Sequence, residues 1–180
     1  MGAMTALPLG QRRYDLFFIV FFAINLGFIT YIVDLEQLVI ADPSHFTYPI
    51  WPPAKLVDLV HWWGQSFDPP LMAREAWWRA TIWIDAIFFG PFYAVAIYAF
   101  VRGKSWIRIP AIIWGSVMMT NVTVILFEEM VGAHATPRPG VIWAANLPWL
   151  LFPVVVIARV AFREHPFAAR QEPLGARQTA

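Results

Sequence analysis

The sequence predicts an all-α fold: an integral membrane bundle of four transmembrane helices, both termini cytoplasmic, with a long outer segment between helices 1 and 2. Three observations predict it. First, 59% of the 180 residues are hydrophobic and only 14% are charged, whereas charged residues make up about a quarter of a soluble domain. Second, four stretches are long and apolar enough to cross a bilayer. Third, the basic residues gather on one side of those stretches.

A hydrocarbon core of roughly 30 Å requires about 20 mostly apolar residues in a helix. The four stretches that qualify cover residues 16–33, 80–101, 109–127 and 141–157. Asn25 and Thr30 interrupt the first stretch, Asp85 is the one charge in the second, and Asn121 lies in the third. A cleaved signal peptide is the alternative for the first stretch. Its apolar part is too long for that, and no small-residue cleavage pattern follows it.

The basic residues set the predicted orientation. Nine of the thirteen precede the first stretch, join the second to the third, or follow the fourth: Arg12, Arg13, Arg102, Lys104, Arg108, Arg159, Arg163, Arg170 and Arg177. The other four, on the opposite side, are Lys55, Arg74, Arg79 and Arg138. Because cytoplasmic loops hold the excess of Lys and Arg, both termini are expected in the cytoplasm.

The outer segment, residues 34–79, is more than a linker. The run Tyr48-Pro49-Ile50-Trp51-Pro52-Pro53 must be extended or turned, because Pro restricts the residue before it. Residues 54–65 then read as a short helix, expected at the membrane surface or capping the bundle. After the fourth stretch, residues 163–180 are polar and Arg-rich and are expected to form a disordered tail. The transmembrane domain is therefore predicted to cover residues 1–162.

Polar residues of all four helices converge on the outer half of the predicted bundle. Asp85 lies about one and a half turns inside the second helix. At similar depth we place Asp34, Asp68, Glu128, Glu129 and Asn146. An ionisable group in the membrane is costly and indicates a functional site. A structural hydrogen bond, to a neighbouring helix or to Arg79, is the alternative for Asp85, and solvated loop charge is the alternative for Asp34, Glu128 and Glu129. Their coincidence in depth favours one shared site.

Several functional classes lack the residues that they need. The chain has no cysteine, and its four histidines lie outside the predicted spans, so no pair can hold a haem between helices. No Gly-rich phosphate loop and no metal-ligand spacing occurs. We therefore expect no cofactor, no metal and, with a net charge of +1, no nucleic acid. A channel or transporter fits poorly, because charge on one side only makes a poor continuous pathway unless the protein oligomerises.

A set of short motifs matches a known family in order and spacing. The densest run is Tyr98-Ala99-Phe100, Gly103, Trp106-Ile107-Arg108, Pro110 and Ile112-Ile113. Further matches are Asp34-Leu35, Asp68-Pro69, Trp77, Pro91-Phe92, Phe127-Glu128, Arg138-Pro139 and Leu150-Leu151 with Pro153. Over residues 16–160 the chain thus resembles the EXPERA family, which includes the sigma-2 receptor (transmembrane protein 97) and the emopamil-binding sterol isomerases.

The resemblance implies a four-helix membrane fold, often dimeric, with an internal cavity for sterols and cationic amphiphiles. In the sigma-2 receptor branch two aspartates line that cavity and pair with a ligand amine; the matching motifs place them at Asp34 and Asp68. Asp85 falls where that branch has a glutamate. The histidine and glutamate of the isomerase branch have no match in residues 26–30, which argues against sterol isomerisation. Asn146 and Trp149, however, resemble the asparagine and tryptophan of the isomerase's last helix.

Three functions remain open. The first is binding of a sterol, terpenoid or cationic amphiphile, or of a membrane lipid, in a cavity lined by Asp34, Asp68, Asp85, Glu128, Asn146, Trp149 and, on the third helix, Asn121. The second is an isomerase or cyclase in which Asp85 protonates an alkene. Asp34 or Asp68 would polarise the carboxyl group of Asp85, and aromatic faces would stabilise the carbocation. The third is a scaffold or trafficking partner without a ligand. A homodimer is expected from the resemblance in each case.

Overall fold

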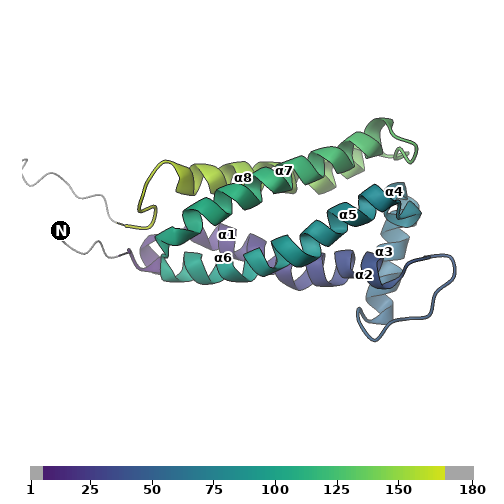
Figure 1. Ribbon diagram of the computed structural model, residues 1–180, viewed down its shortest axis with the longest axis horizontal. Coiled ribbons are helices and arrows are strands. Elements are labelled where there is room, and N and C mark those ends of the chain that lie inside the picture. Colours follow the sequence, from purple (N-terminus) through teal and green to yellow (C-terminus); the bar gives the residue numbers. More distant parts are fainter. Residues whose placement is uncertain (1–5, 169–180) are drawn as a thin grey trace, which may run out of the picture.

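A computed structural model describes residues 6–168 of the chain. Four long antiparallel helices form the bundle (Figure 1), and they cover Asp15–Val39, Ala76–Arg102, Ser105–Val131 and Pro139–Ala161. Each is long and apolar enough to cross a membrane. The predicted all-α fold with four spans is therefore confirmed. We call the end of the bundle near residues 6 and 168 the inner end, following the predicted orientation, and the opposite end the outer end.

The first span consists of α1 (Asp15–Ile24), a π-helical stretch (Asn25–Asp34) and α2 (Leu35–Val39). The sequence predicted that this helix ends near residue 33, whereas it continues to Val39. The polar residues Glu36 and Gln37 do not end it, because both are buried against partners from the outer segment. Asp34 consequently lies within the helix and not just beyond its outer end.

The second span has the same composite form. It consists of α5 (Ala76–Ile84), a π-helical stretch (Asp85–Phe89) and α6 (Gly90–Arg102). Pro91 lies in the first turn of α6, where its missing N–H leaves the preceding turn free to widen. A Cβ on Gly90 would lie 2.7 Å from the Tyr31 hydroxyl, so glycine lets the two π-helical stretches pack closely. The widened turns thus bring Asp34 and Asp85 to facing positions.

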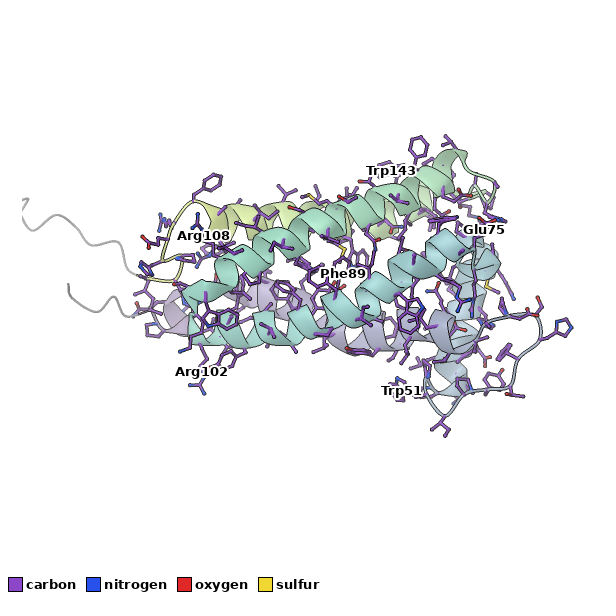
Figure 2. All side chains as sticks on the ribbon, viewed as in Figure 1. Trp51, Glu75, Phe89, Arg102, Arg108 and Trp143 are labelled. Carbon is purple, nitrogen blue, oxygen red and sulfur yellow. The ribbon has the colours of Figure 1, made fainter. Side chains whose placement is uncertain are left out.

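The third and fourth spans form a hairpin. A short 3-10 turn (Ser105–Ile107) leads into α7 (Arg108–Val131), and α8 (Pro139–Ala161) returns beside it along its length (Figure 1). Gly115 faces Ile157 and Pro153 of α8 at the contact. Arg108 donates to the carbonyl of Ala161 and so caps the inner end of α8. Figure 2 shows Arg102 and Arg108 at the inner end, and Trp51 and Glu75 at the outer end.

The outer segment covers the outer end of the bundle. Its helix α3 (Ala54–Ser66) confirms the predicted short helix and runs across the span axes (Figure 1). Val57, Val60, His61 and Gly64 form its buried face. The short α4 (Pro69–Ala73) follows after a turn at Asp68. The outer segment therefore forms a roof over the bundle, which is one of the two positions expected for its helix.

Most of the core lies toward the inner half of the bundle. Phe22, Tyr93, Phe100 and Trp114 are fully buried there, and the rings of Phe92 and Trp114 stack with centroids 5.0 Å apart. A second, smaller cluster lies under the roof and consists of Val60, Leu71, Trp78 and Ile82. Aromatic side chains bury large apolar areas with fixed geometry. The inner half is therefore densely filled.

Residues at both ends of the described chain pack on the inner end of the bundle. Asp15, 1% exposed, forms ion pairs with Arg12 and Arg159. Phe167 is buried between the two guanidinium groups, 4.9 and 5.1 Å from its ring centroid. Residues 163–168 thus fold back on the helices. The rest of the predicted tail, residues 169–180, lies outside the described residues, and the domain boundary at 162 stays a prediction.

Gly103, between α6 and the third span, is a position where a side chain should be destabilising. Its φ is +63°, and an added Cβ would lie 2.6 Å from the Cβ of Ala6. We expect Gly103→Ala to lower the free energy of unfolding by about 1–2 kcal/mol, the cost of a left-handed conformation. Thermal unfolding in detergent would measure it. Gly140→Ala, where nothing lies within 4 Å, is the control, and equal melting temperatures for the two variants would contradict the prediction.

Candidate ligand-binding site

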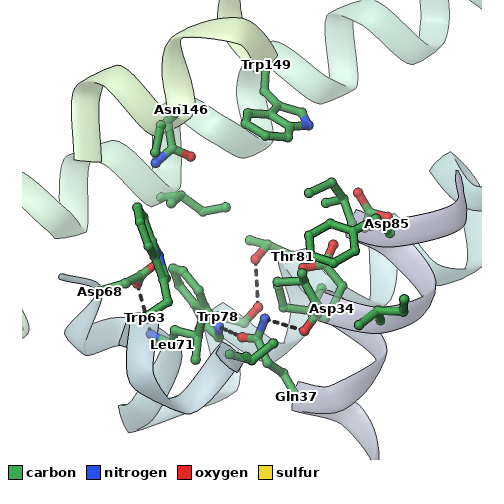
Figure 3. Close-up of a pocket in the computed structure, with 18 of the residues that line it drawn as sticks. Asp34, Gln37, Trp63, Asp68, Leu71, Trp78, Thr81, Asp85, Asn146 and Trp149 are labelled. Atoms are coloured by element: carbon green, nitrogen blue, oxygen red, sulfur yellow. Dashed lines mark hydrogen bonds between the residues drawn. The ribbon is translucent and has the colours of Figure 1, made fainter. Parts of the chain in front are cut away.

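A cavity of about 440 Å³ lies in the outer half of the bundle, between the spans and the roof (Figure 3). All four spans and α3 contribute to its walls. Its apolar lining includes Ile32, Val60, Ile82 and Val122, and four indoles, those of Trp62, Trp63, Trp78 and Trp149. Its polar lining consists of Asp34, Gln37, Asp68, Thr81, Asp85, Asn121 and Asn146. Among residues 6–168, no Lys, Arg or His lines it.

Asp34 and Asp85 form a carboxyl pair on one side of the cavity. Their side chains are in hydrogen-bonding contact with each other, and Asp85 also accepts a hydrogen bond from the Thr30 hydroxyl. Both residues are buried, at 9% and 7% exposed. Two carboxylates in contact repel each other, so such a pair holds one proton between its members. One negative charge remains, and no basic side chain of the described part of the chain lines the cavity beside it.

A second carboxyl pair, Asp68 and Glu129, lies on the opposite side, where Figure 3 shows Asp68 across the cavity from Asp34 and Asp85. Asp68 caps α4 by accepting from the Leu71 N–H at 3.2 Å, and it accepts from the Trp63 indole at 3.4 Å. Its carboxyl group also contacts that of Glu129. Burial raises the pKa of Asp68 above its ordinary value.

Glu129 and Glu128 point in different directions. Neighbouring residues on a helix are about 100° apart, so only one of them can face the bundle. That residue is Glu129, which is 1% exposed. Glu128 instead accepts a hydrogen bond from the His134 N–H in the turn after α7 and does not line the cavity. Its predicted role in ligand binding therefore has no support from its position.

Asn121, Asn146 and Trp149 all line the cavity, as the sequence predicted. The amide of Asn121 donates to the Thr81 carbonyl at 3.3 Å, and that of Asn146 donates within its own helix to Ile142. The Trp149 indole donates to Asn25 at 2.7 Å, and this bond ties the fourth span to the first. Trp149 therefore offers its ring, and not its N–H, to the cavity.

A buried ion pair fixes the roof to the first span. Both oxygens of Glu36 accept from Nη2 of Arg74, at 2.9 and 2.8 Å, and Glu36 also contacts His61 at 2.8 Å. Arg74 further donates to the Ile40 carbonyl. Gln37 accepts from the Trp78 indole at 2.6 Å. These bonds hold the end of the first span against α3, α4 and α5, and so hold the outer wall of the cavity in place.

The cavity opens at one edge. Phe28 of the first span and Leu59 and Trp62 of α3 line it while remaining 38%, 44% and 55% exposed. Phe28 lies within a candidate membrane span, so this edge is expected to face hydrocarbon. It is the candidate entrance for a hydrophobic molecule from the membrane side.

The raised pKa of Asp68 gives the folded protein a defined pH dependence. Because the native state retains this proton above pH 3.8, the value in the unfolded chain, stability falls as pH rises from there toward the folded pKa. We expect Asp68→Asn, which keeps an acceptor for the cap, to be more stable than the wild type at neutral pH and similar to it near pH 4. Denaturant unfolding in detergent at several pH values would measure this. Asp58→Asn, an exposed carboxylate of α3, is the control, and a difference that does not change with pH would contradict the prediction.

Comparisons with known proteins agree with this fold. The sequence model of the EXPERA family (EXPanded EBP superfamily) matches residues 55–160. A protein named Sigma intracellular receptor 2, from Xenopus tropicalis, is 32% identical over 147 residues, which cover 74% of this chain and 80% of that protein. Its namesakes from Macaca fascicularis and Homo sapiens are each 31% identical over 119 residues, covering 58% of this chain and 68% of theirs.

These matches confirm the resemblance and the multi-pass membrane location that the sequence predicted. Asp34-Leu35 and Asp68-Pro69, two of the motifs on which the resemblance rests, both contribute a carboxyl group to the cavity. The family match covers more than half of the chain. The chain belongs to the EXPERA family.

Proposed function

We propose that this protein binds a sterol, another isoprenoid or a hydrophobic amine in the cavity of its outer half. One observation supports the proposal most directly: an apolar cavity of about 440 Å³ contains the Asp34–Asp85 pair and, among the residues that the structure describes, no basic side chain. Ligand sites of this kind have volumes of about 300–1,000 Å³ and few, well-placed polar groups. The relatives' name, a receptor, agrees with ligand binding.

The two ends of such a ligand would meet different surroundings. An amine or hydroxyl would lie against the Asp34–Asp85 pair, where a cation neutralises the remaining charge and a hydroxyl donates to it. The rigid apolar body would contact the rings of Trp63, Trp78 and Trp149. The edge at Phe28 and Leu59 would admit it from the membrane.

Filling the cavity tests the proposal. Ala145 lines the cavity, whereas its neighbour Ala144 is exposed on the same helix and does not. Mass spectrometry of co-purifying lipids should find a sterol or other isoprenoid in the wild type and in Ala144→Phe, and should find it depleted in Ala145→Phe. Equal lipid content in the two variants, or no retained isoprenoid together with no binding of an added sterol or amine, would contradict ligand binding at this site.

A second function, acid–base isomerisation or cyclisation, is supported by one further feature. The Asp34–Asp85 pair holds a proton beside a cavity with four indoles, which is the equipment for protonating an alkene and stabilising a carbocation. In that reaction Asp85 would donate the proton, and Asp34 would polarise the carboxyl group of Asp85. Incubation with unsaturated sterols and terpenoids, with gas chromatography of the products, tests it. A product lost in Asp85→Asn would support an enzyme. The homodimer implied by the family stays a prediction.

A further inference from the structure

The loop that connects α2 to the roof helix α3 exposes a group of apolar side chains. Ile50 is fully exposed, Tyr48 is 54% exposed and Trp51 is 48% exposed. Residues 46–54, which include all three, contain no Asp, Glu, Lys, Arg or His. Single apolar residues are ordinary on a surface that faces water, whereas several of them in an uncharged segment indicate contact with another apolar surface.

One hydrogen bond shows how deep this loop lies. The Trp51 indole donates to the Tyr31 carbonyl at 2.7 Å. Tyr31 belongs to the first span and precedes its outer end, Val39, by eight residues, which corresponds to roughly 10 Å along the helix axis. Trp51 therefore lies beside the span and not beyond its end, and Figure 2 shows it at the side of the bundle. Indole rings are favoured at this level, where the bilayer meets water.

The backbone of the loop suits the membrane interface. Pro49, Pro52 and Pro53 have no N–H, which lowers the number of backbone donors that lipid would leave unpaired. The carbonyl groups of the loop still require water, which the headgroup region supplies and the hydrocarbon core does not. The exposed Lys55 follows at the start of α3, and its long side chain can bring the ammonium group to lipid phosphates.

We propose that residues 48–52 form an interfacial anchor, which inserts Ile50 and Trp51 among the lipids of the leaflet at the outer end of the bundle. The partner of this surface is the bilayer itself. The exposed side chains continue the lipid-facing surface of the first span, to which the Trp51 indole is bonded.

The anchor would hold one edge of the roof. Leu56 and Leu59 line the cavity and lie in the first two turns of α3, shortly after the anchor. The Glu36–Arg74 pair fixes the roof to the first span, and the anchor would fix it to the membrane. This inference concerns the position of the roof and does not depend on a ligand.

Spin labels on single cysteines test it, because the chain has no cysteine of its own. Ile50→Cys places the label on the anchor, and Ser44→Cys, exposed on the same loop, is the matched control. Leu151→Cys, 53% exposed on α8, provides a lipid-facing reference. Power-saturation EPR in phosphatidylcholine nanodiscs compares collisions with O2, which concentrates in lipid, and with a nickel chelate, which stays in water. The O2-to-nickel ratio at Ile50 should approach that at Leu151 and exceed that at Ser44 several-fold.

Two results would overturn the inference. A label at Ile50 that the nickel chelate reaches as readily as the label at Ser44 would mean that the loop lies in water. A label at Ile50 that neither reagent reaches would mean that protein, such as a second copy of this chain, covers the loop. Because the same label is attached at both positions, its own affinity for lipid does not by itself produce a difference between them. Ligand binding in the cavity is measured separately, so either result would leave the proposed function standing.

Discussion

Asp34→Asn/Asp85→Asn is expected to weaken the binding of a hydrophobic monoamine by about 30-fold or more. The double substitution removes the charge of the Asp34–Asp85 pair while preserving its shape, and loss of the buried charge that pairs with the amine costs about 2 kcal/mol or more. A neutral sterol should be affected far less, because an amide can still accept a hydrogen bond from its hydroxyl. Titration of N-butyldodecylamine and of cholesterol into nanodiscs would measure both affinities.

Two further variants make that experiment specific. Asp42→Asn makes the same chemical change on the exposed outer loop and should leave both affinities unchanged. Asp34→Asn alone should lower amine affinity far less than the double variant, because Asp85 keeps the negative charge, still accepts from the Thr30 hydroxyl, and can accept from the new amide as it does from Asp34. An equal loss of sterol and amine binding in the double variant would mean that the pair serves the structure of the bundle and not the recognition of charge.

Much of the fold and part of the site could be predicted from the sequence. Span length predicted the four helices, because the thickness of the bilayer constrains the length of each. Depth from the span ends placed Asp34, Asp85 and Asn146 in one layer, and all three line the cavity. The depth of a residue along a helix follows directly from its position in the sequence. The rotation of a helix about its axis does not, which explains why Glu128 and Glu129 could not be told apart.

Other features depend on contacts that no local pattern reports. Asn25 reads as a mere interruption of an apolar stretch, yet it accepts the hydrogen bond of Trp149, 124 positions away. An amide alone in a membrane span needs a partner, and that need was the available signal. The π-helical turns at Asp34 and Asp85 come from the packing of two helices and have no local sequence signature.

The Glu36–Arg74 pair was missed for the same reason, since 38 positions separate its members. The clue was Glu36 itself, an acidic residue three positions after the first predicted span, in a stretch that continues with the apolar Leu38 and Val39. With Glu36 read as the start of a polar loop, the predicted helix ended too early. The helix extends because Arg74, which follows α4, supplies a guanidinium to the buried carboxylate, and that pairing sets the largest stability effect that we expect.

Arg74→Met should lower the free energy of unfolding by about 3–5 kcal/mol, because it leaves the fully buried Glu36 without its cation. The backbone contributes little to this difference, since Arg74 has φ 50° and Met is as strained there as Arg. Glu36→Gln/Arg74→Met should recover much of the loss, because no buried charge remains. Denaturant unfolding in detergent, followed by tryptophan fluorescence, would give the three values and the coupling energy.

The exposed Arg102 on the last turn of α6 provides the control, and Arg102→Met should change stability by no more than about 0.5 kcal/mol. If Arg74→Met unfolded like Arg102→Met, the ion pair would not hold the roof.

The position of the Glu36–Arg74 pair also predicts an effect on ligand binding that differs from the effect of the Asp34–Asp85 pair. Because Arg74 follows α4, whose cap is Asp68, loosening the roof displaces one wall of the cavity. Arg74→Met should therefore weaken the binding of sterols and amines alike, whereas Asp34→Asn/Asp85→Asn should weaken the binding of amines alone.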